Sequence, residues 1–130
     1  MQITVFTPTY NRAHLLPRLY KSLCAQTCKD FEWIIVDDGS ADDTKSIVDG
    51  FIHDCAITIR YFRQENGGKH RAINRGVKEA KGNLFFITDS DDILPEKSIE
   101  TVLKQYEKAK NHTSFGGVCG LDQTFDGKII

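Results

Sequence analysis

Residues Leu84–Glu96 read "LFFITDSDDILPE", an apolar segment that runs directly into a group of carboxylates. The hydrophobic and β-branched composition of Leu84–Thr88 is typical of a short buried strand. Asp89, Asp91 and Asp92 follow within four positions, and like charges so close to one another repel. A cluster of this kind at the end of a buried strand indicates a ligand that offsets its negative charge.

Two earlier segments show the same pattern of an apolar run that ends in a polar turn. Ile3–Thr7 ("ITVFT") is expected to form a strand that Pro8 ends, and Phe31–Val36 ("FEWIIV") a strand that "DDGS" ends. Apolar residues at helical spacing predict helices between the strands. The other expected elements are a strand at Ile57–Phe62, a return to the sheet at 115–121 ("FGGVCGL"), helices at Arg12–Ala25 and Lys69–Ala80, a helix that opens with Pro95 and runs to Lys110, and one that buries Ile47, Val48, Phe51 and Ile52.

This alternation of strands and helices predicts an α/β fold. Right-handed βαβ units give a doubly wound, mostly parallel sheet with helices on both faces. In such sheets the first strand usually lies centrally, with the second on one side and the fourth on the other, and ligands bind beyond the carboxyl ends. The turns "PTYN", "DDGS" and "DSDD" are therefore expected to meet in one crevice.

Asp89-Ser90-Asp91 forms a DxD pattern. Residues i and i+2 of an extended segment point the same way, so the two carboxylates are able to converge on one cation. Hard divalent ions such as Mg²⁺ and Mn²⁺ take oxygen ligands, commonly carboxylates together with substrate phosphates. The alternative is a solvated turn whose acids cap the following helix, a role that suits Asp92.

The turns after the first two strands also carry candidate ligand-binding residues. Asp37 and Asp38 are placed to accept hydrogen bonds from a ribose hydroxyl or a base N–H. Tyr10 is suited to stack or pack near a base. Asn11 is interpreted as the cap of the next helix, with an Asx turn on its own backbone as the alternative. Ser40 is interpreted as the start of a capping box for the helix after "DDGS".

The stretch "NGGKHR" places two glycines before a helix whose first turn is basic. Lys69, His70 and Arg71 lie where the helix dipole disfavours cations, which makes sense if they share an anion with the backbone N–H groups. The stretch is not a P-loop, because it lacks the GxxxxGK[ST] spacing and follows the third strand. A solvated basic turn is the alternative.

Composition limits the partners and the compartment. The formal net charge of −1 provides no general positive field for nucleic acid or an anionic membrane. The longest apolar runs are far too short to cross a bilayer. The four cysteines lack a CxxC or HxxxH partner motif and are expected to be reduced thiols. We therefore expect a cytoplasmic protein without a nucleic-acid partner, with peripheral association at the inner face of the membrane as the alternative.

Several of these motifs occur together in an order that resembles the N-terminal half of a family 2 glycosyltransferase. The strand into "PTYN", the "QT…FE" approach, "VDDGS", the "NGG" helix and the DxD-type "DSDD" follow one another with similar spacing over nearly the whole chain. Each motif is weak alone, and together they are specific. The resemblance implies a Rossmann-like GT-A fold and a nucleotide-diphosphate-sugar donor, by default a UDP-sugar.

The resemblance also implies roles for individual residues. Asp38 would hydrogen-bond the base, with Asp37 close by, and Asp91 would ligate an Mg²⁺ or Mn²⁺ ion that bridges the diphosphate. Asp89 would face both the ribose and the metal, supported by Asp92. The residues implied for the nucleotide sugar are Pro8, Thr9, Tyr10, Asp37, Asp38, Lys69, Arg71, Asp89 and Ser90, and those implied for the metal are Asp89 and Asp91.

By the same resemblance, the sugar is transferred with inversion to an acceptor hydroxyl that an Asp base deprotonates. In this family the base and the acceptor-binding segments lie well beyond the DxD. We therefore expect them downstream of Ile130 and nominate neither Asp122 nor Asp126. Residues 1–130 are expected to be one domain, a donor-binding half truncated after the part that contains the DxD. An exposed sheet edge would then favour a homodimer.

Two other interpretations stay open. A sugar nucleotidyltransferase uses a similar sheet and metal carboxylates but normally has a glycine-rich basic loop after the first strand, and "PTYNRAHLL" contains no glycine. A nucleotide-sugar binding module without catalysis would keep all of these motifs. A role in polysaccharide synthesis follows from the family resemblance alone.

Overall fold

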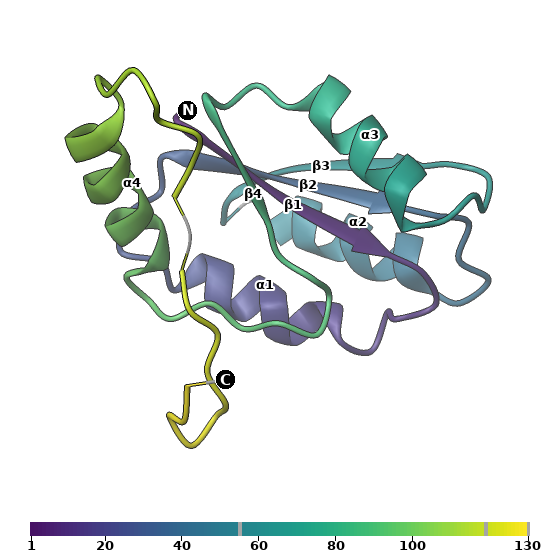
Figure 1. The fold of residues 1–130 in the computed structure, drawn as a ribbon. Coiled ribbons are helices and arrows are strands. Elements are labelled where there is room, and N and C mark those ends of the chain that lie inside the picture. Colours follow the sequence, from purple (N-terminus) through teal and green to yellow (C-terminus); the bar gives the residue numbers. More distant parts are fainter. Residues whose placement is uncertain (55, 119, 130) are drawn as a thin grey trace. The chain divides into compact units, whose positions relative to one another are not determined.

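The computed structural model describes residues 1–54, 56–118 and 120–129 and confirms the alternation of strands and helices (Figure 1). Residues 1–100 form one compact unit and residues 101–130 a second. The elements are, in chain order, β1 (Ile3–Thr9), α1 (Leu16–Cys24), β2 (Phe31–Asp37), α2 (Thr44–Asp54), β3 (Thr58–Arg63), α3 (Lys69–Glu79), β4 (Leu84–Ile87) and α4 (Ser98–Ala109).

The strands form one parallel sheet in the order β3-β2-β1-β4. The predicted arrangement, with the first strand between the second and the fourth, is confirmed. β1 and β2 pair in register from Ile3 with Phe31 to Thr9 with Asp37, so the two strands end side by side. Consequently the turns that follow β1, β2 and β4 all leave the sheet at the edge formed by the carboxyl ends.

Helices cover both faces of the sheet, as predicted. On one face α3 packs over a buried apolar cluster made of Phe6, Ile34, Val36 and Ala72. Figure 1 shows α1 on the opposite side of the sheet from α3. There Tyr20 of α1 stacks on Phe51 of α2 with ring centroids 4.2 Å apart, and both rings stack near Trp33 of β2. These two apolar layers hold the strands in place.

β1 continues through Pro8 to Thr9, so the prediction that Pro8 ends the strand is wrong. Successive residues of a parallel strand direct their backbone groups to its two neighbours in turn. The carbonyl of Phe6 accepts from the N–H of Thr88 on the β4 side, and that of Thr9 accepts from Asp38 on the β2 side, each at 2.9 Å. The nitrogen of Pro8 therefore faces the β4 side, where pairing has ended, and its missing N–H breaks no ladder bond.

Two further details of the helices after β1 and β2 differ from the prediction. α1 begins at Leu16, four residues later than expected, with Pro17 in its first turn. Proline is favoured there because the first turn of a helix has no intrahelical acceptor for its N–H groups. Ile52 of α2, expected to be buried, is 38% exposed, because Phe51 takes the position that faces α1.

The start of α4 and the segment after it also correct the prediction. α4 begins at Ser98, whose N–H bonds to the carbonyl of Pro95, so Pro95 precedes the helix and does not open it. In the second unit, Gln123 and Ile129 form an isolated antiparallel bridge after α4. The expected return of "FGGVCGL" to the sheet is wrong for its described residues, since adjacent glycines weaken a strand.

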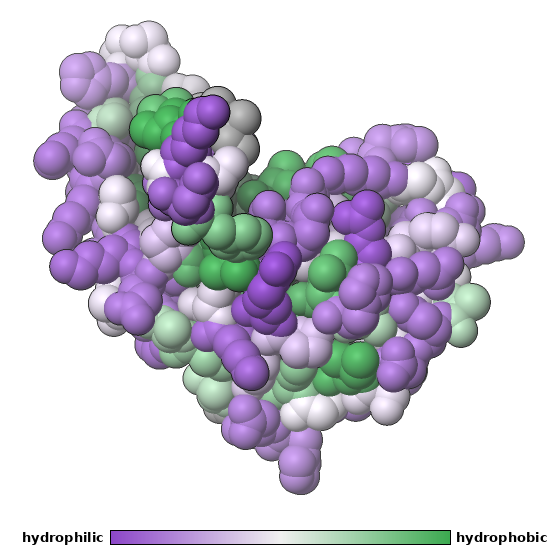
Figure 2. Space-filling model, turned by 90° about the horizontal axis from the view of Figure 1, so that it is seen from below, coloured by the Kyte–Doolittle hydropathy of each residue, from purple (hydrophilic) through white to green (hydrophobic). Residues whose placement is uncertain are grey.

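Figure 2 shows one face of the molecule, on which hydrophilic side chains predominate and hydrophobic ones gather in separate areas. Within residues 1–54, 56–118 and 120–129, no helix is long and apolar enough to cross a membrane. Cys24 and Cys28 are free thiols. Cys55 and Cys119, also expected to be reduced, lie outside the described residues.

Glu32 ties together the end of the sheet opposite to the polar turns. It is fully buried and accepts hydrogen bonds from Thr4 Oγ1 (2.7 Å), the Lys81 N–H (2.8 Å) and Arg60 Nη1 (3.1 Å). Burial raises the pKa of Glu32, but these hydrogen bonds and the charge of Arg60 outweigh it and hold the pKa below its ordinary value. The ionised form of Glu32 therefore stabilises this end of the sheet.

Replacing Glu32 with Gln should lower the free energy of unfolding by about 2 kcal/mol or more, because an amide cannot serve three donors and Arg60 loses one of the two carboxylates, Glu32 and Glu79, with which it pairs. The folded-state pKa of Glu32 lies below its unfolded value. Its contribution is therefore present above the unfolded pKa and is lost as the pH falls through the folded pKa. Urea unfolding from about pH 7 to pH 3 should show a smaller loss of stability in the variant than in the wild type.

Glu65→Gln is the matched control, because Glu65 is exposed. It should change neither the stability at neutral pH nor the pH dependence. A Glu32→Gln protein as stable as the wild type would contradict the role assigned to the buried carboxylate.

Candidate functional site

A pocket of about 570 Å³ opens where the turns after β1, β2 and β4 meet the start of α3, and all of its lining residues belong to the first unit. The three turns thus meet in one crevice, as the strand order requires. The predicted residues that line the pocket are Pro8, Thr9, Tyr10, Asp38, Lys69, Asp89, Ser90 and Asp91. The pocket is also lined by Arg12, Asn66, Gly68 and Ala72.

Two of the predicted residues, Asp37 and Arg71, do not line this pocket. Asp37 is fully buried and accepts hydrogen bonds from the Ser40 N–H (2.9 Å) and the Tyr61 hydroxyl (2.6 Å). Burial and the bond to Asp37 raise the pKa of Tyr61, so its hydroxyl stays a donor. Arg71 lines a neighbouring cavity of about 370 Å³. Asp37 thus fixes the turn after β2, and Arg71 lies beside the pocket.

Asp38 holds the Gly67–Gly68 loop at the edge of the pocket. Its Oδ1 accepts from Gln64 Nε2 (2.9 Å) and the Gly67 N–H (3.0 Å), and its Oδ2 accepts from the Gly68 N–H (2.8 Å). Burial raises the pKa of Asp38, but these hydrogen bonds and the charge of Arg71 hold the pKa below its ordinary value. Asp38 is therefore ionised, and its Oδ2 retains acceptor capacity for a ligand.

The turns after β1 and β2 are fastened to each other by hydrogen bonds between side chains and backbone. Asn11, in the left-handed region (φ 51°), donates its N–H to Ser40 Oγ (2.9 Å) and accepts from the Ala41 N–H (2.7 Å). The predicted helix-capping roles of Asn11 and Ser40 are wrong, since α1 begins at Leu16 and α2 at Thr44. Each side chain bonds the other turn, because the register of β1 and β2 places the two turns side by side.

Thr9 carries a hydroxyl that has no hydrogen-bond partner within the described part of the chain. The residue is 3% exposed and lines the pocket. Buried hydroxyls are normally hydrogen-bonded, and leaving one unpaired is unfavourable. A polar ligand group placed against Thr9 would remove that penalty. Tyr10, the next residue, is 49% exposed and lines the same pocket, where its ring is available to a flat ligand.

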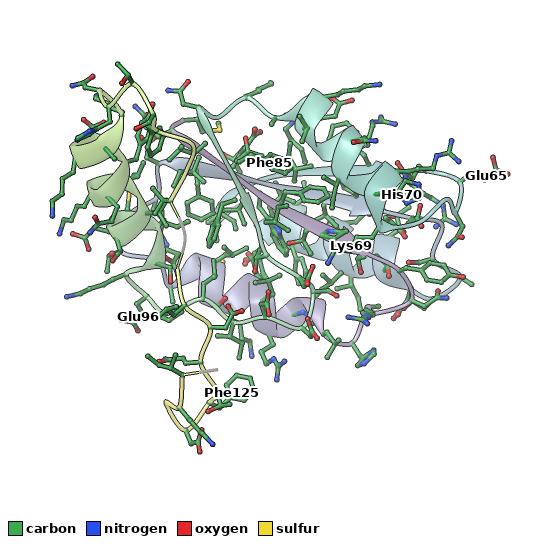
Figure 3. The ribbon with its side chains drawn as sticks, in the orientation of Figure 1. Glu65, Lys69, His70, Phe85, Glu96 and Phe125 are labelled. Carbon is green, nitrogen blue, oxygen red and sulfur yellow. The ribbon has the colours of Figure 1, made fainter. Side chains whose placement is uncertain are left out.

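The carboxylates of Asp89, Asp91 and Asp92 each offer one oxygen within 4.8 Å of the others. Asp92 Oδ2 accepts from the Asp89 N–H (2.8 Å), so it serves the turn itself. The other two carboxylates line the pocket beside cations: Lys69 Nζ lies 2.8 Å from Asp89, and Arg12 Nη1 lies 3.8 Å from Asp91. Figure 3 shows Lys69 on the side of α3 toward the segment that leaves β4. Two basic side chains thus offset the repulsion expected from the sequence.

The chain beyond the acids is fixed to the C-terminal end of α1. The buried Gln26 side chain donates to the carbonyl of Pro95 (2.8 Å) and accepts from the Ile99 N–H (3.0 Å). The Thr27 N–H donates to the carbonyl of Glu96 at 2.8 Å, and Figure 3 shows Glu96 next to this end of α1. Gln26 and Thr27, the "QT" pair of the sequence motif, therefore hold the end of the carboxylate-bearing segment that is farther along the chain from β4.

Arg12 and Asn66 are the polar pocket residues that sequence reasoning missed. Arg12 directly follows "PTYN", and Asn66 opens "NGG". Both residues lie in turns that leave the carboxyl ends of strands, and this position in the sequence could have identified them as pocket residues. Asn66 Nδ2 donates to the carbonyl of Asp38 (3.1 Å), which ties the loop before α3 to the turn after β2.

Residues 4–123 match the family described as "Glycosyl transferase family 2". Glycosyltransferase GlyG of Streptococcus pneumoniae serotype 4 is 36% identical over 128 residues, which cover 98% of this chain and 42% of that protein. The GalNAc(5)-diNAcBac-PP-undecaprenol beta-1,3-glucosyltransferase of Campylobacter jejuni is 34% identical over an alignment of 134 residues, which covers 98% of this chain and 43% of that protein. The chain thus spans less than half the length of these relatives.

Solved structures show the same fold. TarS 1–349 of S. aureus in complex with UDP gives a TM-score of 0.79 at 25% identity, covering 92% of this chain and 38% of that one. TarS 1–349 was also crystallised with UDP-GlcNAc. The mannosyltransferase PcManGT from Pyrobaculum calidifontis, in complex with GDP-Man and Mn²⁺, gives a TM-score of 0.76 at 28% identity over 88% of this chain and 34% of that one. The fold is the Rossmann-like GT-A fold, and, with residues 4–123 matched, the chain belongs to glycosyl transferase family 2.

Proposed function

We propose that this chain is the donor-binding domain of an inverting, metal-dependent glycosyltransferase that uses a nucleotide-diphosphate sugar, with a UDP-sugar as the expected donor. The observation that carries the proposal is the pocket itself. The unpartnered Thr9 hydroxyl, the ionised Asp38 and the carboxylates of Asp89 and Asp91 line one cavity. These groups suit a nucleoside on one side and a metal-bound diphosphate on the other. The complexes of TarS with UDP and UDP-GlcNAc support this assignment.

The nucleoside is proposed to bind against the turns after β1 and β2. Uracil carries one N–H and two carbonyl groups, so it needs both an acceptor and a donor. Asp38 Oδ2 provides the acceptor and Thr9 Oγ1 the donor, and both residues line the pocket. Pro8 and Tyr10 complete this side with apolar and aromatic surface.

Two residues implied by the family resemblance act indirectly in this proposal. Asp37 shapes the turn that carries Asp38, through its hydrogen bonds to Ser40 and Tyr61. Arg71 acts through its charge, which helps to keep Asp38 ionised. Neither side chain needs to touch the nucleotide for its loss to weaken binding.

The carboxylate oxygens of the acid cluster after β4 suit a hard divalent cation. Asp89, Asp91 and Asp92 provide carboxylate oxygens within 4.8 Å of one another, the ligand type that Mg²⁺ and Mn²⁺ prefer. We assign Asp89 and Asp91 as ligands, Asp92 as the residue that fixes their turn, and Ser90 as part of the donor-binding wall. A bound Mg²⁺ or Mn²⁺ would supply Lewis-acid stabilisation of the charge on the departing nucleoside diphosphate. The complex of PcManGT with GDP-Man and Mn²⁺ supports the proposal of a divalent metal.

The transfer is proposed to proceed with inversion at the anomeric carbon. The acceptor hydroxyl attacks that carbon as its bond to the diphosphate oxygen breaks, and a general base takes the hydroxyl proton. We place the base in the part of the longer relatives that this chain does not match. Residues 1–100 then have the task of binding and orienting the donor, and Asp122 and Asp126 have no role in the proposal.

A nucleotide-sugar binding module without transfer is the second candidate. It rests on the same pocket, whose lining residues are assigned here to binding and not to a general base. Both functions use the same pocket and differ in turnover. Slow hydrolysis of a bound UDP-sugar by the isolated chain would favour the transferase, whereas binding without any turnover fits the module.

The outer edge of β4 is the proposed place for association with a second copy. β4 is the last strand in the sheet order, and Ile87 at its end is 46% exposed. An unpaired strand edge offers backbone donors and acceptors to another chain. The homodimer stays a prediction, as do the cytoplasmic location and a peripheral position at the inner face of the membrane.

Calorimetric titration with UDP, GDP and their sugar conjugates, with and without Mn²⁺, tests the donor site directly. We expect UDP to bind in the presence of Mn²⁺, to bind much more weakly without it, and to bind more tightly than GDP. A preference for GDP would correct the nucleoside. A folded, monodisperse sample that binds neither nucleotide would contradict the proposed site.

Asp91→Asn should weaken Mn²⁺-dependent UDP binding by about tenfold or more, because it removes a charged metal ligand. The same change should leave the free energy of unfolding nearly unaltered, since it also relieves repulsion among the acids. Asp43→Asn is the control, because Asp43 is an exposed acid in the turn before α2. Binding by the Asp91 variant that equals the wild type would remove Asp91 from the site.

Asp38→Asn should loosen the Gly67–Gly68 loop, because an amide nitrogen cannot accept from the N–H groups that the carboxylate now binds. We expect the free energy of unfolding to fall by about 1–3 kcal/mol and amide exchange at both glycines to accelerate. Hydrogen exchange followed by NMR measures the second effect. Unchanged exchange at Gly67 and Gly68 would show that another contact holds the loop.

A further inference from the structure

We propose that Lys69 and Arg12 exchange partners when the site fills. In this structure each is paired with a carboxylate that we assign to the metal, and each turns to the diphosphate when a divalent cation takes that carboxylate. The inference rests on the proposed donor site. It assigns Lys69, already implied as a nucleotide-sugar residue, and the newly found Arg12 to the diphosphate, and it makes metal binding and nucleotide binding depend on each other.

The two cations approach the acids from different elements. Lys69 is the first residue of α3, and its Nζ lies 2.8 Å from Asp89 Oδ1. Arg12 follows the turn after β1, and its Nη1 lies 3.8 Å from Asp91 Oδ2. All four side chains line the same pocket. Two positive and two negative charges therefore share one wall of the cavity and balance each other.

Both ion pairs, Lys69–Asp89 and Arg12–Asp91, are exposed to solvent and are therefore easily broken. The side chains of Lys69 and Asp89 are 58% and 43% exposed, and those of Arg12 and Asp91 are 52% and 55% exposed. Ion pairs this open to water are weak, because water and salt screen the attraction. The contrast with Glu32 is clear, since that carboxylate is fully buried and bound by three donors. Release of Lys69 and Arg12 thus requires little rearrangement.

The position of Lys69 at the start of α3 suits an anion that lies between its side chain and the helix N-terminus. A cation in the first turn of a helix is disfavoured by the helix dipole, whereas the same place suits an anion. A divalent cation between Asp89 and Asp91 would leave two unpaired positive side chains beside it. A nucleoside diphosphate restores the balance, and Arg12 provides a guanidinium that is able to bind two phosphate oxygens at once. The unpartnered Thr9 hydroxyl in the same pocket independently indicates a polar ligand there.

This exchange has a thermodynamic consequence. Metal alone must displace Lys69 and Arg12 without giving them a new partner, so it should bind weakly. Nucleotide provides that partner, so it should strengthen metal binding, and metal should strengthen nucleotide binding by the same factor. Removing one basic side chain should therefore strengthen the binding of metal alone and weaken the binding of nucleotide in the presence of metal.

Lys69→Met and Arg12→Met test the exchange. Mn²⁺ affinity in the absence of nucleotide is measured from the EPR signal of free Mn²⁺, and we expect each variant to bind Mn²⁺ roughly two- to fivefold more tightly than the wild type. UDP affinity at saturating Mn²⁺ is measured by calorimetry, and we expect each variant to bind UDP about tenfold or more weakly. A merely structural role for either residue would weaken both.

Lys78→Met is the matched control. Lys78 is exposed on the same helix, lies outside the pocket and has no ion pair among the described residues. It removes the same charge at a distance where salt screens the field, so it should alter neither affinity. Lys69→Arg keeps the charge and should restore wild-type behaviour in part.

The outcomes separate the two proposals. If the wild type binds Mn²⁺ and UDP together but Lys69→Met and Arg12→Met bind Mn²⁺ alone no more tightly, the exchange is refuted and the donor site stands. The exchange is likewise refuted if UDP affinity is unchanged in both variants. If the wild type binds no UDP at saturating Mn²⁺, the donor site and the exchange both fall.

Discussion

The pairing of β1 between β2 and β4 is the constraint on which the rest of the molecule depends. All strands run in parallel, so every connection must cross a face of the sheet through a helix, and every strand ends at the same edge. The central position of β1 then puts its turn between the turns of the other two strands. The pocket, the hydrogen bonds that Asn11 donates to Ser40 and accepts from Ala41, and the Lys69–Asp89 pair all follow from this arrangement.

Carboxylates serve three different purposes in this fold, and their surroundings decide which. Glu32 is fully buried with three donors, so its charge is committed to the structure. Asp38 is buried and anchors a loop, yet its Oδ2 has one protein donor and remains open to a ligand. Asp89 and Asp91 are half-exposed and held by single flexible cations. Glu32 at the far end of the sheet is thus buried and fully bonded, whereas Asp89 and Asp91 at the pocket are half-exposed and each pairs with a single cation.

The strand order and the meeting of three turns could be predicted because both follow from the alternation of apolar runs and helical spacing. What failed depended on facts that a linear pattern does not contain. Pro8 fits within β1 because its nitrogen faces the side where pairing has ended. Asn11 and Ser40 are residue types that often cap helices. Here the side-chain oxygen of each accepts a hydrogen bond from the adjacent turn and caps no helix. Asp37 and Asp38 look equivalent in sequence, but Asp37 is the fully buried last residue of β2, whereas Asp38 follows the strand and lines the pocket. Arg12 belongs to no periodic pattern, and its place directly after "PTYN" was its one sign in the sequence.

The attachment of the segment after β4 to α1 carries a consequence for how the protein is able to vary. The stretch from Asp89 to Ile99 begins at a strand and ends in the hydrogen bonds of Gln26, so both of its anchors are fixed points of the first unit. The number of residues in this stretch is therefore constrained, because both of its ends are held in fixed positions. An added or deleted residue would shift the acids relative to the pocket or pull Gln26 out of its buried place. Length variation among relatives should accordingly occur in other loops, and changes in this stretch should alter residue identity and leave the number of residues unchanged.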